Sequence, residues 1–386
     1  MVAARSTEGL QVALAHDWLT GMRGGEAVLE RLCLRYPHAP LYTLFHIPGS
    51  VSSAIEDRRI VTSILDRLPG AHRRYRQLLP LYPAAVEALD VTAFDLVVST
   101  SHCAIKALRL GSGARHLCYV HTPMRYVYEQ FDDYFGPGRA SPAARLAMTA
   151  LRPVLQAWDR RTAHRPTELV ANSQHVAARI RRHWGREASV VHPPVAMERF
   201  AVPEPGVSRD HYLVLGALAP YKRVDLAVRA FAQLGLPLIV AGDGPEAARL
   251  QHLASPNVRF VGRVDDDEAR RLYQGARALI FPGEEDFGIT PLEAQACGTP
   301  VIAFGRGGAL ETVRGDGDGA TGVFFGESTE SALIEAVRRF ERVREGFDPS
   351  RLREHARRFE HTRFDAEMSA LLEPVEELVR QSRGVR

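Results

Sequence analysis

The chain has 386 residues, of which 45% are hydrophobic and 25% are charged, a balance that is ordinary for a globular protein. This length exceeds what a single hydrophobic core usually supports, so it predicts two domains. A net charge of +3 is too small to indicate a nucleic-acid partner. No apolar run approaches the roughly 18 residues that span a bilayer. The first residues lack the long apolar region of a signal peptide, so we expect a cytoplasmic protein.

The cysteines are few and scattered. Cys33, Cys103, Cys118 and Cys297 stand mostly beside apolar residues, and none is in a C-x-x-C spacing. This pattern favours reduced thiols in the core over disulfides or zinc ligands.

Short apolar runs alternate with helical patterns along the whole chain, which predicts an α/β fold with parallel sheets. In the first half, the predicted strands are Gln11–His16, Leu41–Phe45, Asp95–Ser99, His116–His121, Glu168–Asn172 and Ser189–Val191. In the second half, they are Tyr212–Leu215, Pro237–Ala241, Val258–Val261, Ala278–Phe281, Pro300–Phe304 and Gly322–Phe325. The tail is helical, with predicted helices at Ser331–Val343, Leu352–Phe359 and Asp365–Ser382.

A proline-rich stretch between His192 and Pro205 separates two halves of similar length. We predict one Rossmann-like, doubly wound domain over residues 1–200 and a second over residues 201–364. The last helix, in residues 365–386, has no sheet left to pack on in the second half and should cross back to the first domain. Two such domains in tandem would face each other across a cleft, where a ligand with two ends would bind.

A glycine-rich loop follows the first predicted strand. Thr20 to Gly25 contains Gly21, Gly24 and Gly25, and a helix is expected to begin at Glu26. Glycines directly before a helix N-terminus allow the backbone to approach a phosphate closely. A simple tight turn explains the same residues, so both interpretations stay open.

The segment from Phe281 to Ala303 has the pattern of a strand, a glycine-bearing loop, a short helix and a second strand. A helix that begins at the carboxyl edge of a parallel sheet presents backbone N–H groups to an anion. Glu285 and Glu293 flank these groups, and their carboxylates would bind hydroxyls attached to the anion. A sugar nucleotide carries phosphates and hydroxyls in this arrangement.

Glu293 also has a purely structural interpretation. Residues 290–293 form a capping box, with Thr290 as the N-cap and a proline at the first helical position. Glu285 has no such role. It stands between two other acids, which repel it unless a cationic or hydroxylated group faces them.

Only two of the 49 basic residues are lysines, Lys106 and Lys222. In a chain so biased towards arginine, lysine should persist where a compact ammonium differs in effect from a planar guanidinium. The bias therefore draws attention to both positions.

These motifs together resemble the retaining glycosyltransferases of family 4, which have the two-domain GT-B fold, and the resemblance covers nearly the whole chain. Its most specific element is the E-x7-E pattern from Glu285 to Glu293, supported by YKRVD at 221–225, GDGP at 242–245 and the strand at 257–262. The first half is similar to mannosyltransferases that use GDP-mannose to build O-antigen and exopolysaccharide repeat units. That similarity rests on HDWLTGMRGGEAVLE, YVHTPMRYVYE, ANSQHVAARIRRHWGR and VHPPV.

The resemblance implies that the domain of residues 1–200 binds the acceptor and that the domain of residues 201–364 binds the nucleotide-sugar donor. It also implies roles for individual residues of the second domain. Lys222 would hold the donor diphosphate, Glu285 would contact the donor sugar and Glu293 would bind the ribose hydroxyls. Sugar hydroxyls or phosphate would meet the backbone amides around Phe287, Gly288 and Ile289. Further donor-binding candidates are Arg223 and Arg263.

In the first domain, the resemblance implies that Gly24 and Gly25 face the diphosphate. His121, at the end of a predicted strand, matches a histidine near the reacting centre of the sugar, so His121 and Glu285 are the catalytic candidates.

One position departs from the family pattern. Family members usually carry an arginine that forms a diphosphate clamp with the lysine, whereas Ala217 stands here between Gly216 and Leu218. The departing diphosphate still needs positive charge. Arg223, or Arg125 from the other domain, would supply it.

The family retains the anomeric configuration of the sugar, which implies that the departing phosphate itself takes the acceptor proton. On this interpretation neither glutamate is a nucleophile, and catalysis is mainly electrostatic stabilisation and positioning. We expect no cofactor beyond the sugar nucleotide, with GDP-mannose as co-substrate and a glycan, lipid-linked in this kind of pathway, as acceptor. The alternatives are a UDP-sugar donor, or a non-catalytic subunit that binds sugar nucleotides or glycans.

Two acidic clusters are more simply structural than metal-binding. The run Asp265–Glu268 precedes a helical pattern and predicts an N-cap with an acidic first turn. Asp316 and Asp318 stand among glycines and predict a loop. We therefore expect no metal site.

Arginines gather between Arg58 and Arg76, ahead of the apolar run Leu78–Pro83. This combination is typical of a peripheral contact with an anionic membrane, here the cytoplasmic face of the inner membrane. A solvated basic face beside a core helix is the alternative.

Overall fold

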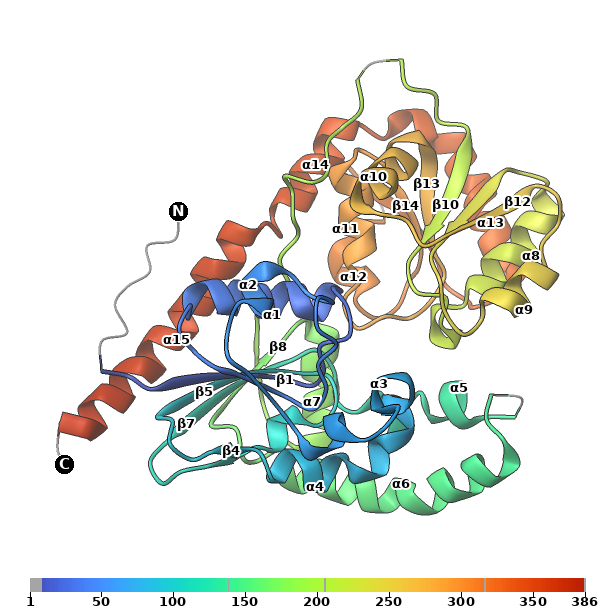
Figure 1. Cartoon of the computed structure of the whole chain (residues 1–386). Coiled ribbons are helices and arrows are strands. Elements are labelled where there is room, and N and C mark those ends of the chain that lie inside the picture. Colours follow the sequence, from blue (N-terminus) through green and yellow to red (C-terminus); the bar gives the residue numbers. More distant parts are fainter. Residues whose placement is uncertain (1–8, 138, 205, 316, 385–386) are drawn as a thin grey trace. The chain divides into compact units, whose positions relative to one another are not determined.

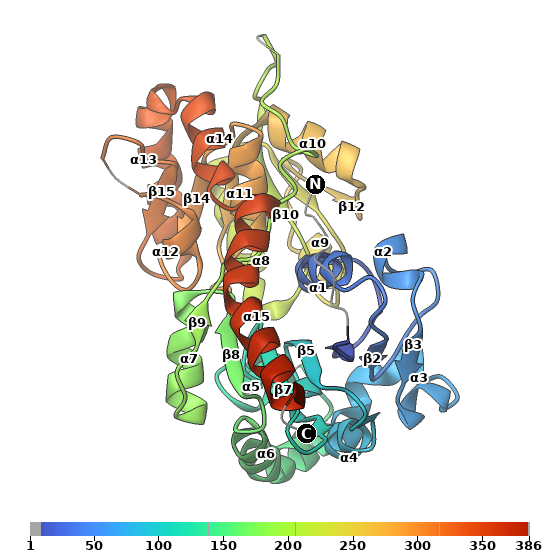
Figure 2. The same ribbon diagram turned by 90° about the vertical axis from the view of Figure 1, so that its left-hand side faces the viewer.

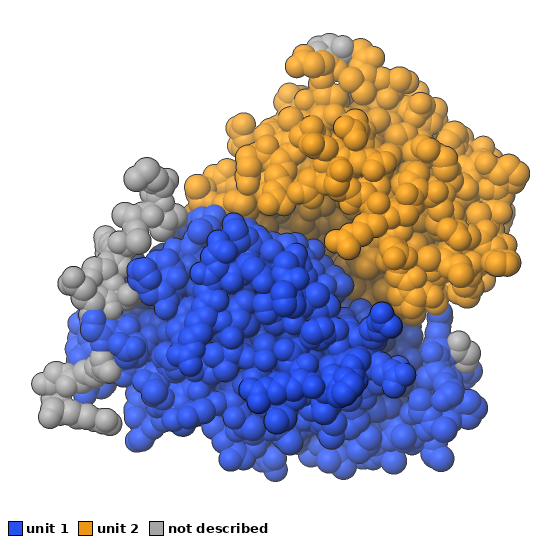
Figure 3. All heavy atoms as spheres, in the orientation of Figure 1, with its two compact units in different colours: residues 1–193, 364–386 blue, residues 194–363 orange. Residues whose placement is uncertain are grey.

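The computed structural model describes residues 9–384 except residues 138, 205 and 316 (Figure 1). The chain divides into two compact units (Figure 3). Unit 1 consists of Met1–Pro193 together with Phe364–Arg386, and unit 2 consists of Pro194–Arg363. The corresponding boundaries drawn from the sequence lie at residues 200 and 364.

Each unit is built on a parallel sheet. In unit 1 the strand order is β3-β2-β1-β5-β7-β8-β9, and β4 and β6 form a separate pair. The strands are β1 Val12–His16, β2 Leu41–Thr43, β3 Ile60–Thr62, β4 Asp90–Val91, β5 Leu96–Ser101, β6 Arg109–Leu110, β7 Arg115–Val120, β8 Glu168–Ala171 and β9 Ser189–Val190. The direction of strand addition reverses between β1 and β5, as in a doubly wound fold.

Helices cover both faces of this sheet. The α-helices of unit 1 are α1 Gly24–Arg35, α2 Ser53–Glu56, α3 Ala71–Arg74, α4 Tyr82–Glu87, α5 Phe131–Phe135, α6 Pro142–Thr162 and α7 Gln174–Trp184. Short 3-10 helices are η1 Ile64–Arg67, η2 Tyr75–Leu81, η3 Ile105–Ala107 and η4 Arg125–Val127.

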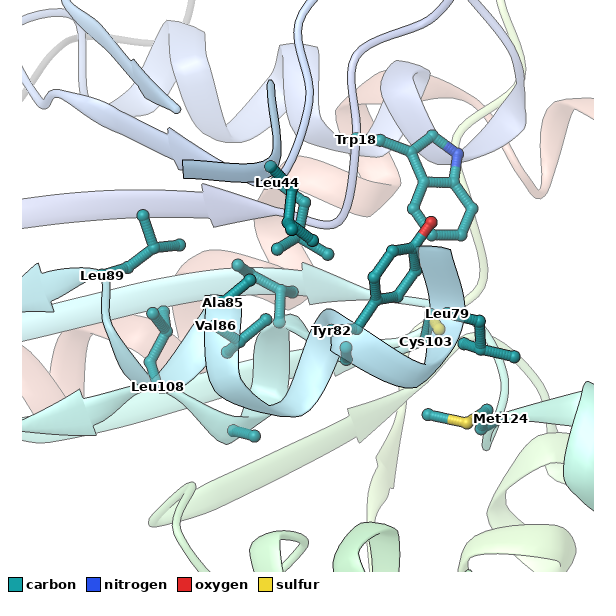
Figure 4. Packing of buried hydrophobic residues seen from close by; sticks show 14 of the residues in the cluster. Trp18, Leu44, Leu79, Tyr82, Ala85, Val86, Leu89, Cys103, Leu108 and Met124 are labelled. Atoms are coloured by element: carbon teal, nitrogen blue, oxygen red, sulfur yellow. The ribbon is translucent and has the colours of Figure 1, made fainter. Parts of the chain in front are cut away.

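Alternate residues of the strands supply the two cores of unit 1. Val12 and Leu14 of β1 pack in one core with α1 and with the final helix, α15 His361–Gly384. Ala13 and Ala15 face the other core, which contains α4 and the buried side of α6 (Figures 1 and 2). Figure 4 shows part of this second core, where Tyr82 lies beside Trp18. The alternation follows directly from the two-residue period of a strand.

Unit 2 has the strand order β12-β11-β10-β13-β14-β15. The strands are β10 His211–Leu215, β11 Leu238–Ala241, β12 Val258–Gly262, β13 Ala276–Phe281, β14 Val301–Phe304 and β15 Gly322–Phe325. Numbered from the first strand of the unit, this is the order 3-2-1-4-5-6 of the dinucleotide-binding folds. The two Rossmann-like domains predicted from the sequence are therefore confirmed.

The remaining helices belong to unit 2 and the tail. They are α8 Val224–Leu234, α9 Ala247–His252, α10 Asp266–Gly275, α11 Ile289–Ala296, α12 Ala309–Thr312, α13 Glu330–Val343 and α14 Pro349–Arg357, with 3-10 helices η5 Pro220–Lys222 and η6 Arg344–Gly346. Helix α15 begins in unit 2 and continues into unit 1.

Helix α15 is fixed to unit 1 by both apolar and polar contacts. Phe364 and Leu372 are buried against α1. Arg31 Nε donates to Asp365 Oδ1 over 3.0 Å, and Tyr36 Oη donates to Glu376 Oε1 over 2.5 Å. The tail therefore completes the core of unit 1.

Each strand expected from the sequence is present, with ends shifted by at most two residues. Strands β3, β4 and β6 were not predicted. They have two or three residues each, and β3 is only partly buried, so none produces an apolar run. The four cysteines are buried and free, as predicted. Within the described part of the chain, no helix is both long and apolar enough to traverse a bilayer.

Lys106, one of the two lysines, lies in the core of unit 1. Its Nζ donates to Asp159 Oδ1 over 2.6 Å, and neither side chain is exposed. Asp159 Oδ2 accepts hydrogen bonds from Tyr128 Oη and Trp184 Nε1 over 2.9 and 2.7 Å. The ammonium also lies 5.1 Å from the ring centre of Trp158. A compact ammonium between indole rings fits this site in a way that a planar guanidinium would not.

We predict that Asp159→Asn lowers the free energy of unfolding by about 3–5 kcal/mol, because it leaves the Lys106 ammonium buried without its counter-charge. Urea denaturation measures the loss. Arg181→Ala, which breaks an exposed ion pair with Glu187, is the control and should change stability by less than about 0.5 kcal/mol. Equal effects of the two substitutions would contradict the assignment.

Candidate active site

The candidate site of unit 2 lies where the strand order reverses, between β10 and β13. The loops that follow these neighbouring strands leave the same carboxyl edge and run in opposite directions, and doubly wound folds bind their ligands at this point. The first loop leads through η5 to Lys222, and the second carries Glu285.

Lys222 and Glu285 meet at this edge. Lys222 Nζ donates to Glu285 Oε1 over 2.7 Å, and the two side chains are 16% and 17% exposed. The cationic group that the crowded acidic loop requires is therefore Lys222. The structure brings together one residue expected to hold phosphate and one expected to contact the sugar.

Glycines allow the two loops to approach each other. A Cβ on Gly283 would lie 2.6 Å from Lys222 Cα and 2.6 Å from the Tyr221 carbonyl oxygen. On the far side, a Cβ on Gly308 would lie 2.2 Å from Phe287 Cα, and the Gly308 N–H donates to the Glu285 carbonyl over 2.8 Å. The backbone around the acidic loop is thus packed too closely for any larger residue at these positions.

The N-terminus of α11 differs from the prediction. The N-cap is Gly288, with φ of 90°, and the helix begins at Ile289. The predicted capping box with Thr290 as N-cap is therefore wrong, because the left-handed glycine starts the helix two residues earlier. Phe287 is buried in the core, which leaves the backbone, rather than its ring, to face a ligand at this edge.

Glu293 does not cap α11. Its Oε2 accepts a hydrogen bond from Tyr273 Oη of α10 over 2.8 Å. Burial raises the pKa of this carboxyl, and the hydrogen bond from Tyr273 opposes the increase only in part. The capping interpretation of Glu293 is thereby removed, and the side chain instead joins α11 to α10 through one of its two oxygens.

Arg223 occupies a strained position. Its φ of 50° makes it the one non-glycine residue with positive φ in the described parts of the chain. Its guanidinium donates from Nη1 to Ser328 Oγ over 2.8 Å and from Nε to Asp225 Oδ1 over 3.3 Å. Arg223 therefore secures the turn that carries Lys222.

Ala217 and Arg263 lie at the same carboxyl edge. Ala217 is exposed in the loop after β10, and Arg263 is exposed directly after β12, two strands away. The structure does not show Arg263 joined to the Lys222–Glu285 pair.

In unit 1, the glycine loop and the histidine come together at the equivalent edge. Gly24 and Gly25 are the first two residues of α1, so the helix begins two residues before the predicted start at Glu26. A Cβ on Gly25 would lie 3.5 Å from His121 Nε2 and 3.7 Å from His16 Cε1. The start of α1 therefore lies against two imidazole rings at the ends of β7 and β1.

Sequence reasoning missed the buried groups around these rings. His16 Nδ1 is 2.6 Å from Thr100 Oγ1, and its Nε2 is 3.7 Å from the buried carboxylate of Glu26. Burial lowers the pKa of His102 to about 4, so this ring is neutral at physiological pH. The position of His16 and Asp17 at the end of the first strand was the signal that could have identified the cluster.

Asp17 is fully buried and organises the loop after β5. Its two carboxylate oxygens accept four backbone N–H bonds, of 2.6 to 2.9 Å, from residues 102–105. Burial by itself would raise the pKa of Asp17, but His102 and these amides lower it below its usual value. This carboxylate is therefore an anchor for the loop.

The two acidic clusters have structural contacts. Asp265 caps α10 by accepting a hydrogen bond from the Glu268 N–H over 2.8 Å, as predicted. Asp318 pairs with Arg351 over 2.5 Å, whereas Asp316 lies outside the described residues.

Two family models match the chain. The model described as Glycosyltransferase Family 4 matches residues 22–199, and the model described as Glycosyl transferases group 1 matches residues 200–359. The two models together cover residues 22–359, and with the two parallel-sheet units these matches identify the GT-B fold. The chain belongs to the glycosyltransferases of family 4.

Curated relatives share part of the chain. A D-inositol 3-phosphate glycosyltransferase of Streptomyces bingchenggensis is 34% identical over 40% of this chain and 41% of its own. A D-rhamnosyltransferase of Pseudomonas aeruginosa is 32% identical over 33% of this chain and 35% of its own. A GDP-mannose-dependent alpha-(1-6)-phosphatidylinositol monomannoside mannosyltransferase of Mycolicibacterium smegmatis is 29% identical over 49% of this chain and 56% of its own. The chain thus spans less than two thirds of the length of each.

Solved structures share the fold over nearly the whole chain. Sucrose-phosphate synthase of Thermosynechococcus elongatus superposes with a TM-score of 0.71 at 17% identity and covers 95% of this chain and 99% of its own. HepE of Anabaena, in complex with UDP-glucose, superposes with a TM-score of 0.67 at 18% identity and covers 94% of this chain and 99% of its own.

We predict that Lys222→Ala removes most of the increase in melting temperature that a nucleoside diphosphate produces, because the ammonium is the cation at this edge of the sheet. The melting temperature without nucleotide should also fall, because Glu285 loses its counter-charge beside two other acids, so the nucleotide response is measured against each variant's own nucleotide-free value. Arg229→Ala, which breaks an exposed pair with Glu330 elsewhere in unit 2, is the matched control. A full nucleotide response in Lys222→Ala would place the phosphate site elsewhere.

Proposed function

We propose that this chain is a retaining glycosyltransferase that transfers an α-mannosyl group from GDP-mannose to a glycan acceptor, lipid-linked, in polysaccharide assembly. The observation that carries the proposal is the Lys222–Glu285 pair at the strand reversal of unit 2. The choice of donor is supported by the similarity to the GDP-mannose-dependent mannosyltransferase of Mycolicibacterium smegmatis and by the mannosyltransferase-like motifs of the first half.

Different groups at the edge of unit 2 would bind the diphosphate, the sugar and the ribose of the donor. Lys222 and the first backbone N–H groups of α11 would hold the diphosphate, since both are positive. Glu285 would accept hydrogen bonds from sugar hydroxyls. Glu293 would bind the ribose through the oxygen that Tyr273 does not use.

The ion pair must be exchanged when the donor binds. In the free protein the Glu285 carboxylate neutralises Lys222, and the diphosphate would take over that role. Glu285 would then be released towards the sugar, which couples the two ends of the donor in one site.

The chemistry then needs no protein nucleophile. The bond between the anomeric carbon and the diphosphate oxygen breaks, and its electron pair leaves with the diphosphate. The acceptor oxygen bonds to the same face of the anomeric carbon and passes its proton to the departing phosphate oxygen. Lys222 stabilises the charge that develops, and no metal or cofactor enters the proposed reaction.

In unit 1, His121 would lie near the reacting centre of the sugar, with Gly25 leaving the helix start open beside it. Its ring would orient the sugar and stabilise charge, as a positioned polar group does. A peripheral contact with the cytoplasmic face of a membrane would bring unit 1 to a lipid-linked acceptor.

The donor is tested by thermal-shift and transfer assays with GDP-mannose, UDP-glucose and UDP-N-acetylglucosamine, in the presence of excess EDTA. We expect the largest stabilisation with GDP and GDP-mannose, and full transfer from GDP-mannose despite the chelator. A preference for UDP would select the competing donor class. Nucleotide binding without transfer to any glycan would support the alternative of a non-catalytic subunit. Loss of activity with EDTA, restored by magnesium, would overturn the metal-free reaction.

We predict that His121→Ala lowers turnover by roughly two orders of magnitude, in the range for one positioned electrostatic group. Binding of GDP alone should be almost unchanged, because GDP lacks the sugar. NMR of the product should show an α linkage. A β linkage would exclude the retaining mechanism.

A further inference from the structure

Helix α6, Pro142–Thr162, has an exposed face without charge. Between Pro142 and Ala157, each of which the structure describes, the residues that are exposed as a whole include none with a charge, and a threonine is the sole polar one. The side chain of Arg145, at the edge of this face, is 42% exposed. Leu146 is 74% exposed and Val154 is 62% exposed, the largest and the third largest exposures of large hydrophobic residues in the described part of the chain. The exposed residues are Pro142, Ala143, Ala144, Leu146, Ala147, Thr149, Ala150, Pro153, Val154 and Ala157.

These residues form one continuous surface. At about 100° per residue, all except Ala144 fall within an arc of about 160°, and they extend over about 24 Å of helix. The opposite side of α6 is buried in the core of unit 1 through Met148, Leu155 and Trp158. The helix is therefore apolar on two sides, of which the core covers one.

The charges that α6 itself places at the border of the uncovered face are arginines. Arg160 and Arg161 are exposed in the last turn and close the face at its carboxyl end. Arg145 lies at the edge of the face and is paired at 3.8 Å with Asp132, an exposed acid of α5. The acid of α6 itself, Asp159, is buried against Lys106 and contributes nothing to the surface.

This combination points to one kind of partner. A helix with an apolar face bordered by arginines lies in the plane of an anionic bilayer, with its apolar side among the acyl chains and its guanidinium groups at the headgroups. If this face packed against the same face of a second copy, neither copy would offer an acidic residue of α6 to Arg160 and Arg161 of the other. Charge complementarity therefore favours a lipid surface over self-association.

We propose that the uncharged face of α6 is a membrane-docking surface that binds anionic lipid. It is distinct from the arginine-rich segment that the sequence suggested for this role. In that segment, the Arg58 guanidinium donates to the carbonyl oxygens of Cys33, Tyr36 and Ala54 and holds the ends of α1 and α2 together, whereas the other arginines up to Arg76 are exposed.

The test is flotation of the full chain with two kinds of vesicle, phosphatidylcholine alone and phosphatidylcholine with an equal part of phosphatidylglycerol. Binding should occur with the anionic vesicles and weaken as sodium chloride rises from about 0.1 to 0.5 M. The double variant Leu146→Glu with Val154→Glu should bind about tenfold or more weakly, because two apolar side chains no longer leave water. The variant Arg160→Glu with Arg161→Glu should lose the preference for the anionic vesicles.

The matched control places the same two charges elsewhere. Leu34→Glu with Val343→Glu changes residues that are 51% and 48% exposed on α1 and α13, and should bind like the unmodified chain. Equal melting temperatures of the four proteins verify folding, because all of the substituted side chains are on the surface.

Three results would overturn the proposal. They are absence of vesicle binding, equal binding of the Leu146→Glu, Val154→Glu variant, and a dimer in light scattering that this variant alone dissociates. The last would assign the face to a second copy. The vesicle assay uses neither donor nor acceptor, so its result is separate from that of the donor assays.

Discussion

The parallel order of the strands is the constraint on which both candidate sites depend. All strands of such a sheet end at one edge, and the loops diverge where the order of addition reverses. In unit 2 this reversal brings Lys222 within 2.7 Å of Glu285, although 63 positions separate them in the chain. In unit 1 it brings the loop after β1, with Gly25, next to the histidines at the strand ends. The order of the strands therefore decides which side chains meet at these edges.

Buried charge sets the second constraint. A carboxylate withdrawn from water must be satisfied by donors or by a counter-charge, or the fold loses several kcal/mol. Asp17 meets this condition with four backbone amides, and Asp159 meets it with an ammonium, a phenol and an indole. Both groups hold the loops of unit 1 at the edge where Gly25 and His121 lie. The polar core of this unit therefore supports the position of its functional edge.

Sequence patterns predicted most of the architecture because apolar runs and glycine-bearing loops are local signals. They did not predict the short strand β3, whose residues are only partly buried. The capping box at Thr290 was a reasonable local match, but Gly288 in a left-handed conformation starts α11 earlier, and Glu293 turns to Tyr273. Which residues meet across loops, such as Lys222 with Glu285, depends on the order of the strands. No local pattern contains that information.

Lys222 and Arg223 are adjacent in the turn after β10, but their side chains make different contacts. This difference bears on the arginine that Ala217 replaces. Positive φ costs a non-glycine residue of order 1 kcal/mol, so Arg223 persists there only because its surroundings hold it. The bonds to Ser328 and Asp225 do this, and they direct the guanidinium towards the loop after β15. Lys222, one residue earlier, points instead to Glu285. The strained turn thus separates two neighbouring cations, one for the fold and one for the site. In this structure the Arg223 guanidinium is directed away from Glu285, so in the proposed reaction the diphosphate charge would fall first to Lys222 and to the amides of α11.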